Sequence, residues 1–233
     1  MRQESLDLGL KPTQSLENFY PGPNQDILQL LEDWLLSIGP QMRPTPFYIW
    51  GEAGSGKAHF LKAVMRAAQS SARHGIFLSA GDLNKVQSLD FDPHWQLMVL
   101  DDVHLLNPAQ EAVVFNWFIH ALLPKDGLYR AILLSGDRPA TDLRLREDLR
   151  TRISGGMVYG LKVMNEEERR EVLIQQANLR GLSLRVEVLD FMLARFSRDL
   201  SSLVGWLDQL DRYALQTQRP VTIPLIKDML KDI

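Results

Sequence analysis

Residues 51–59, GEAGSGKAH, have the spacing of a phosphate-binding loop. Gly51, Gly56 and Lys57 satisfy the pattern G-x-x-x-x-G-K, in which backbone N–H groups and the following helix N-terminus surround phosphate oxygens while the lysine reaches the terminal phosphates. The apolar run PFYIW precedes the loop and the helical pattern AHFLKAVMRAAQ follows it, as this mechanism requires. The alternative is a plain glycine-rich turn between a strand and a helix. The predicted nucleotide-binding residues of the loop are Gly51, Gly54, Ser55, Gly56, Lys57, Ala58 and His59.

Ala58 stands where a loop that hydrolyses nucleotide carries Ser or Thr. That hydroxyl normally ligates Mg²⁺, the ion that neutralises charge during phosphoryl transfer, so we expect weak Mg²⁺ binding and weak hydrolysis. Diphosphate binding depends mostly on the backbone cradle and Lys57. The sequence therefore predicts ADP, or ATP, as a structural ligand, in a chain that is not an efficient ATPase itself.

Two further segments end in side chains suited to nucleotide chemistry. Asp101 and Asp102 close the apolar run LMVLDD, where the first carboxylate would order a weakly held Mg²⁺ and the second would activate water. Ser135 ends AILLS and is a candidate sensor of the γ-phosphate. The alternative is that these polar residues only terminate strands.

The elements that must position these residues alternate between strand and helix. Such alternation predicts a parallel sheet covered on both faces. A helix is expected from Asn24, as its cap, to Gly39, with Ile27, Leu31 and Trp34 on its apolar stripe. The expected strands are 46–51, 75–80, 97–102 and 129–137, and the other expected helices are 59–72 and 108–123.

The pattern after Val163 changes to helices alone. Asn165 and Glu168 form a capping box before the first helix, Gly181 separates it from the next, and Thr222 caps the last. We therefore divide the chain into a flexible tail, an α/β base and an all-helical unit, with the boundaries 1–14, 15–163 and 164–233.

Composition narrows the function classes. The 233 residues carry a net charge of −3, which gives no broad basic field, so we expect no direct sequence-specific DNA binding. The chain has no cysteine, and its five histidines show no ligand spacing, which argues against a zinc site. No apolar run reaches membrane length and no apolar signal region opens the chain, so we expect a cytoplasmic protein without membrane contact.

Four segments, in this order, resemble the AAA+ module of the DnaA family of bacterial replication initiators: GEAGSGKAHFLKA, LMVLDDVHLL, ILLSGDRPATDL and LRTRISGGMVYGL. The resemblance covers about Ser15 to Ile233 and implies an AAA+ P-loop base followed by a helical lid. Initiators of this family continue into a DNA-binding domain after the lid, whereas this chain ends there.

The closer resemblance is to the short Hda branch of that family, which stimulates hydrolysis of initiator-bound ATP while attached to the DNA sliding clamp. The segment from Arg198 to the C-terminus resembles the Hda lid. Residues 3–8, QESLDL, resemble a clamp-binding peptide in which Gln3 forms hydrogen bonds while Leu6 and Leu8 fill an apolar pocket. The alternative is an amphipathic tail without a partner.

Arg152, in LRTRIS, matches the arginine finger of the family by position. A guanidinium presented across a subunit interface offsets charge on the transferred phosphoryl group. Arg150 is the competing finger, and a solvated basic loop is the alternative, because Arg144 and Arg146 lie close by. The second-sensor arginine of the lid has no clear equivalent, since Arg198 precedes the expected helix and Trp206 stands where the sensor aligns.

Residues 15–24 resemble the adenine-side segment of the family. Phe19, Tyr20, Pro21 and Asn24 could pack on the base by stacking and local hydrogen bonds. The alternative is a hydrophobic staple in front of the first helix. Both arrangements are compatible with one another.

Together these features predict an AAA+ regulator that inactivates the initiator DnaA by supplying Arg152 in trans to its ATP, with the sliding clamp as tether. The expected partners are therefore the initiator and the clamp, and the family's rings and filaments leave self-association open. Two rivals remain: an autonomous ATPase, and an interaction module related to helicase loaders.

Overall fold

The computed structural model describes residues 16, 19–36, 44–83, 91–196 and 200–231, without the side chains of Ser201 and Ser202. These residues form two compact units, one within Gln14–Val163 and one within Met164–Ile233. The predicted clamp-binding residues Gln3, Leu6 and Leu8 lie outside the described residues.

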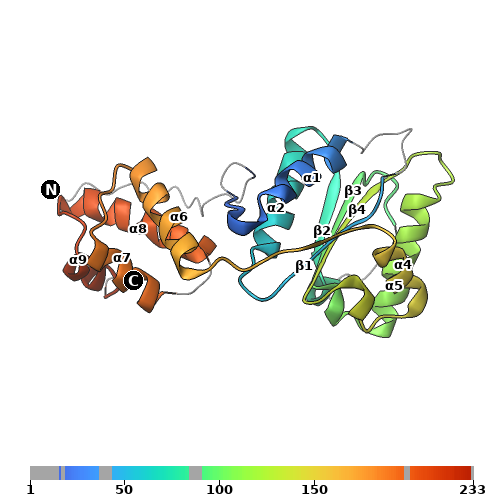
Figure 1. The fold of residues 1–233 in the computed structure, drawn as a ribbon. Helices are drawn as coiled ribbons and strands as arrows, with labels where there is room; N and C mark the ends of the chain where they lie inside the picture. Colours follow the sequence, from blue (N-terminus) through green and yellow to red (C-terminus); the bar gives the residue numbers. More distant parts are fainter. Residues whose placement is uncertain (1–15, 17–18, 37–43, 84–90, 197–199, 232–233) are drawn as a thin grey trace. The chain divides into compact units, whose positions relative to one another are not determined.

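A five-stranded parallel sheet forms the centre of the first unit (Figure 1). Its strand order is β2-β3-β4-β1-β5, and all pairings are parallel. The predicted parallel α/β fold is thus confirmed, although the fifth strand was not predicted. The bounds are β1 Phe47–Trp50, β2 Gly75–Ser79, β3 Leu97–Asp101, β4 Ala131–Gly136 and β5 Met157–Gly160.

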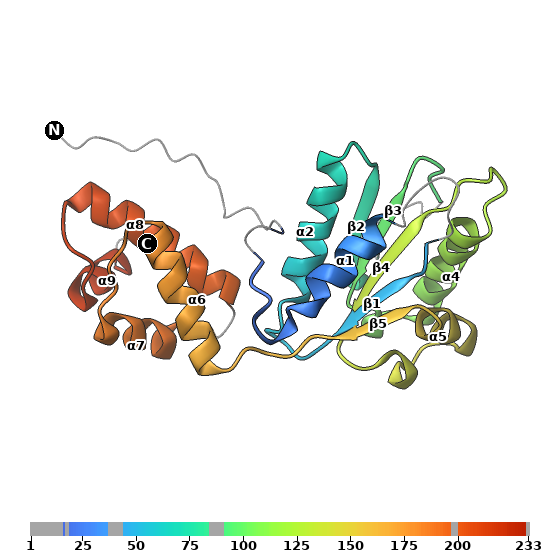
Figure 2. The ribbon, with the colours of Figure 1, turned by 45° about the horizontal axis from the view of Figure 1, so that its top comes forward.

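Helices cover both faces of this sheet (Figures 1 and 2). Successive strand residues point to opposite faces, so Phe47 and Ile49 pack in the core beneath α1 and α2, whereas Tyr48 packs beneath α4 and α5. The bounds are α1 Asp26–Leu36, α2 Lys57–Ser70, α3 Ala80–Leu83, α4 Pro108–Leu122 and α5 Glu147–Ser154.

The start of α1 differs from the prediction. Asn24 lies in a short 3₁₀ helix, Gly22–Asn24, and α1 begins only at Asp26. The Asn24 side chain donates to the carbonyl oxygens of Pro21 (3.0 Å) and Lys162 (2.9 Å) and accepts from the Lys162 N–H (2.7 Å). The prediction of Asn24 as a helix cap is wrong because its amide joins two segments that lie 138 residues apart.

The second unit contains four helices among the described residues: α6 Glu166–Leu179, α7 Val186–Arg195, α8 Leu200–Thr217 and α9 Ile223–Met229. The predicted capping box is confirmed, since Asn165 accepts from the Glu168 N–H and Glu168 accepts from the Asn165 N–H. Thr222 caps α9 as predicted. In the part of the chain that the structure describes, no helix is long and apolar enough to cross a membrane.

Candidate nucleotide site and arginine surface

The phosphate-binding loop joins β1 to α2. Gly54 and Gly56 have φ values of 84° and 94°, a backbone conformation that side chains with a Cβ rarely adopt. Gly51 has no room for a Cβ, which would lie 2.6 Å from the Leu161 carbonyl oxygen. Because α2 begins at Lys57, its unpaired N–H groups and positive end point toward the loop. The loop therefore has the backbone geometry that phosphate oxygens require.

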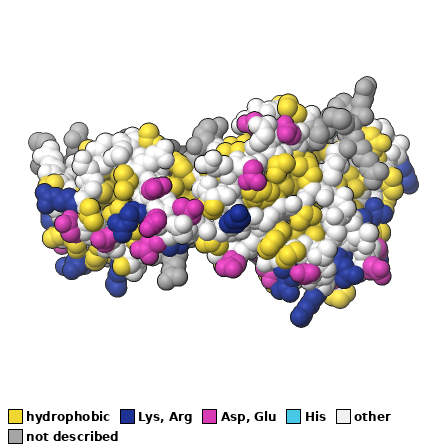
Figure 3. Space-filling view, in the orientation of Figure 1, with side chains coloured by type: hydrophobic (Ala, Val, Ile, Leu, Met, Phe, Trp, Pro, Cys, Tyr) yellow, Lys and Arg dark blue, Asp and Glu magenta, His cyan; other side chains and the backbone are white. Residues whose placement is uncertain are grey.

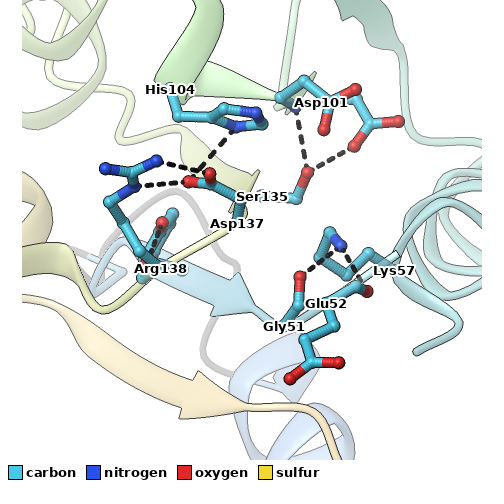
Figure 4. Close-up of polar contacts among 10 residues, drawn as sticks. Gly51, Glu52, Lys57, Asp101, His104, Ser135, Asp137 and Arg138 are labelled. Carbon is cyan, nitrogen blue, oxygen red and sulfur yellow. Dashed lines mark hydrogen bonds and ion pairs between the residues drawn. The ribbon is translucent and has the colours of Figure 1, made fainter. Parts of the chain in front are cut away.

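Lys57 is turned toward its own loop (Figure 4). Its Nζ donates to the carbonyl oxygens of Gly51 (2.6 Å) and Glu52 (3.0 Å). Burial lowers the pKa of Lys57, while the nearby carboxylates of Asp102 and Asp101 act in the opposite direction. A phosphate in the loop would offer this ammonium a charged acceptor in place of two carbonyls.

The structure brings Asp101 and Ser135 together at the carboxyl edge of β3 and β4 (Figure 4), and Asp102 is hydrogen-bonded to Ser135 there. The Ser135 hydroxyl donates to the Asp101 carboxylate and accepts from the Asp102 N–H at 3.0 Å. Ser135 is fully buried, and Asp102 has a left-handed backbone with φ of 58°. Ser135 therefore braces the two aspartates, and the γ-phosphate sensing predicted for it stays a prediction.

The surroundings of the Asp102 carboxyl shift its pKa. Burial raises its pKa, and the charge of Asp101 raises it further, while His104 and Lys57 lower it. The charges of Asp102, Asp101 and Asp137 in turn raise the pKa of Lys57, against the effect of burial. The predicted lysine and aspartates thus lie close enough for their charges to influence the pKa of Lys57 and that of Asp102.

Sequence reasoning missed three residues at this edge: His104, Asp137 and Arg138. Asp137 follows β4 two residues after Ser135 and accepts two hydrogen bonds from the Arg138 guanidinium, at 2.8 and 2.6 Å, which lower the pKa of Asp137. His104 Nδ1 lies 3.8 Å from Asp137 and has no hydrogen-bond partner among the described residues. The signal was present, because Asp137 is the last residue of the predicted strand segment 129–137, which also contains Ser135.

These residues fit the phosphates of a nucleotide better than they fit a metal ion. The buried Ser55 hydroxyl has no hydrogen-bond partner among the described residues and lies within the loop. Ala58 has no side-chain oxygen, and one Asp101 oxygen already accepts from Ser135. No group of three or more His, Cys, Asp or Glu side chains within the described ranges could hold a metal. The loop therefore presents the donors that phosphate oxygens need, whereas few side-chain oxygens near it are left to ligate Mg²⁺, and the binding of ADP or ATP stays a prediction.

The predicted adenine-side residues fall into two groups. Phe19 is buried and packs against His59 and Phe60, with ring centroids 5.6 and 5.4 Å away. Tyr20 and Pro21 are partly exposed beside it. Phe19 lies near the loop, since a Cβ added at Gly56 would meet its ring at 3.6 Å. Phe19 therefore packs beside the loop in the core of the base, and the Asn24 amide is occupied by hydrogen bonds to the backbone of Pro21 and Lys162, so packing of these residues on an adenine base stays a prediction.

The arginines of the second predicted site lie at and before α5. Arg152, in the last turn of α5, has its guanidinium 4.9 Å from the centre of the Phe115 ring. Arg146 forms an ion pair with Asp148 at 2.7 Å, whereas Arg152 forms none among the residues that the structure describes. Arg150 is two residues from Arg152, about 200° around the helix, so the two side chains leave α5 on different faces.

The lid gives no defined second sensor. Arg198 lies outside the described residues. Trp206, on α8, is stacked on Phe196 with ring centroids 4.5 Å apart and an interplanar angle of 26°. Phe196 and Trp206 thus form an aromatic pair within the helical unit.

Residues 166–230 match the family described as "Hda, lid domain". Among solved structures, domain III of the replication initiation protein DnaA from Thermotoga maritima is similar, with 22% identity, a TM-score of 0.68, and coverage of 96% of this chain and 98% of that chain. AMPPCP-bound DnaA from Aquifex aeolicus is similar at 24% identity and a TM-score of 0.64, over 84% of this chain and 64% of that chain.

A more distant structure is the RuvB Holliday junction branch migration motor of Thermotoga maritima, with 14% identity, a TM-score of 0.59, and coverage of 95% of this chain and 72% of that chain. The predicted base and lid architecture is confirmed by these findings. The chain thus has the AAA+ fold of DnaA domain III, and its helical unit is similar to the Hda lid domain over residues 166–230.

Proposed function

We propose that this chain is a DnaA-related replication regulator that supplies Arg152 in trans to ATP bound by a replication initiator. In this proposal, residues 3–8 attach the chain to the DNA sliding clamp, and the chain's own adenine nucleotide is chiefly a conformational ligand. The Hda-type lid at 166–230 and the DnaA-like fold support the class of regulator. The trans activity and the tether extend beyond those similarities.

The observation that carries the proposal is the state of Arg152. Its guanidinium rests on an aromatic ring and forms no ion pair among the described residues, so its charge is available to an anion. By contrast, Arg138 and Arg146 are paired with Asp137 and Asp148. Figure 3 shows Lys and Arg side chains interspersed with Asp and Glu side chains along the lower part of the first unit. A phosphoryl group in a partner's site would meet, in Arg152, a guanidinium that no described carboxylate neutralises.

The chain's own loop supports binding more than turnover. Gly51, Gly56 and Lys57 provide the phosphate cradle, while Ala58 provides no ligand for Mg²⁺. The Aquifex aeolicus DnaA structure contains AMPPCP, an analogue of ATP, so an adenine nucleotide is the ligand we propose for this loop as well. A bound nucleotide would stabilise the folded base by mass action without being hydrolysed.

The test is single-turnover hydrolysis of radiolabelled ATP pre-bound to the initiator, with the clamp loaded on DNA. Wild type should accelerate hydrolysis, and Arg152→Ala should lose on the order of 10³-fold of that acceleration. Arg150→Ala is the matched control and should retain it. Deleting residues 1–8 should abolish clamp attachment and stimulation together, with the fold intact.

The contrary outcomes are equally specific. A wild-type chain that leaves the initiator's ATP untouched would overturn the proposal. Mg²⁺-dependent turnover by the chain alone would instead favour an autonomous ATPase built on Lys57, Asp101 and Asp102. Binding to a replicative helicase that survives deletion of residues 1–8 would favour a module related to helicase loaders.

A further inference from the structure

One aromatic ring contacts two guanidinium groups at the start and end of α5. Phe115, a half-buried residue of α4, has the Cζ atom of Arg146 5.1 Å from its ring centre and that of Arg152 4.9 Å away. Both distances are within the range in which a cation is attracted to the face of an aromatic ring. Helices α4 and α5 lie side by side in both ribbon views (Figures 1 and 2).

A second α4 side chain fixes where α5 begins. Glu111 lies one helical turn before Phe115 and is buried, and its carboxylate accepts a hydrogen bond from the Arg146 N–H at 2.6 Å. Arg146 is also paired with Asp148 at 2.7 Å. The N-terminal end of α5 is therefore held to α4 by a charged hydrogen bond as well as by the Phe115 ring.

The two arginines that contact the ring differ in whether their charge also has a carboxylate partner. Arg146 already has a carboxylate partner, so its charge is largely satisfied. Arg152 is in contact with the ring alone among its described charged and aromatic neighbours. A cation held only by an aromatic face keeps its N–H groups for another acceptor, because the attraction to the ring is electrostatic and uses no oxygen or nitrogen acceptor.

A long arginine side chain loses rotamer freedom when it binds a phosphate across an interface. If the ring already restricts those rotamers, less freedom is lost at the moment of binding, and the rate of the step that needs the arginine increases. Arg152 then supplies the positive charge, and Phe115 determines where that charge lies.

From these contacts we infer that Phe115 is a positioning residue, which holds the Arg152 guanidinium in the orientation needed to act on a phosphoryl group bound by another subunit. The inference rests on the proposed function, since it concerns the residue proposed to act in trans. Phe115 itself does not touch the reacting atoms. Its contribution should therefore appear in the maximal rate of stimulated hydrolysis and not in the concentration needed to reach it.

The kinetic test compares four chains in the single-turnover assay: wild type, Phe115→Leu, Phe115→Trp and Phe191→Leu. Leucine keeps the apolar bulk without the π face, and tryptophan keeps a ring face. Phe191, which lies under the Lys227 ammonium at 5.9 Å in the helical unit, is a matched cation–π control. We expect Phe115→Leu to lower the maximal rate by roughly 3- to 30-fold, with rescue by tryptophan and no effect at Phe191.

A different split would overturn the inference. If Phe115→Leu raises the half-saturating concentration of this chain while the maximal rate is unchanged, Phe115 contacts the partner and does not position Arg152. Failure of tryptophan to rescue a folded Phe115→Leu defect would also overturn it, because the ring face would then be irrelevant. Circular dichroism and the melting temperature of each variant establish that the fold is intact.

A second measurement needs no partner. The side-chain Nε–Hε and Hδ signals of Arg152, assigned by comparison with Arg152→Lys, should be shifted upfield by the ring in wild type and in Phe191→Leu but not in Phe115→Leu. Absence of the shift in wild type would overturn the inference even if wild type stimulates hydrolysis. A shift that is present in a wild-type chain without stimulating activity would refute the proposed function, and with it the role of the stack in catalysis.

Discussion

The ammonium of Lys57 lies 2.6 Å from the carbonyl oxygen of Gly51, so the first glycine and the lysine of the phosphate-loop pattern are hydrogen-bonded to each other. The lysine side chain thus folds back onto the loop that precedes it. A bound phosphate would have to exchange this contact for its own, and the neutral carbonyl is the weaker acceptor. Nucleotide affinity should therefore depend strongly on Lys57.

The first prediction concerns that lysine. Lys57→Ala removes the only loop side chain that carries a positive charge. A hydrogen bond to a charged group contributes about 1.5–3 kcal/mol and each tenfold change in affinity corresponds to about 1.4 kcal/mol, so we expect ADP affinity to fall by roughly 100-fold. Isothermal titration calorimetry measures the dissociation constant. Lys62→Ala, an exposed lysine of the same helix, should leave it unchanged. Equal losses for both variants would place the ligand elsewhere.

The second prediction concerns the missing hydroxyl. Ala58→Thr restores a ligand for Mg²⁺, so ATP should bind more tightly in Mg²⁺ than in EDTA, with little difference between the two conditions for wild type. Ala58→Val has nearly the same shape without the oxygen and should behave like wild type. Titrations with and without Mg²⁺ measure the effect. A gain shared by Thr and Val would show that bulk, and not metal ligation, is responsible.

The third prediction concerns the brace between β3 and β4. Ser135→Ala leaves the Asp102 N–H and an Asp101 oxygen without their buried partner, which costs about 1–3 kcal/mol of unfolding free energy. For a chain of this size that lowers Tm by roughly 2–4 °C per kcal/mol. Thermal melts followed by circular dichroism measure it, with the exposed Ser70→Ala as control. An unchanged Tm would mean that the hydroxyl does not hold the aspartates in solution.

The fourth prediction concerns pH. Arg130 is buried and donates to both Asp126 oxygens, at 3.1 and 2.5 Å, and these hydrogen bonds lower the pKa of Asp126 to about 2, from an ordinary value of 3.8. A lowered folded-state pKa stabilises the protein above the unfolded-state value, and that stability is lost as the pH falls through the folded-state value.

Asp126→Asn should therefore lower Tm at pH 7, and its difference from wild type should shrink as the pH falls from about 4 to about 2. Differential scanning calorimetry across that range measures the two curves. Glu187→Gln, at an exposed position of the helical unit, is the control and should follow wild type throughout. Parallel curves for wild type and Asp126→Asn at all pH values would contradict a role for the Asp126 charge.

Features that depend on nearby residues were determined by the sequence itself. The apolar runs 47–50, 97–101 and 131–136 form buried strands because their side chains are apolar on both faces. The glycine pattern determined the loop, because only glycine adopts φ near 90° readily. The capping box at Asn165 and the cap at Thr222 were readable because a cap and its helix are within a few residues.

Features that depend on distant residues were decided only by the tertiary structure. Strand β5 is short and partly exposed, and it exists because β1 offers a free edge for parallel pairing. Asn24 was expected to cap a helix but instead bonds to Lys162, and Ser135 bonds to Asp101, 34 residues away. The Phe115 and Arg152 side chains meet across α4 and α5. Such contacts follow from how the elements pack, and local periodicity contains no information about packing partners.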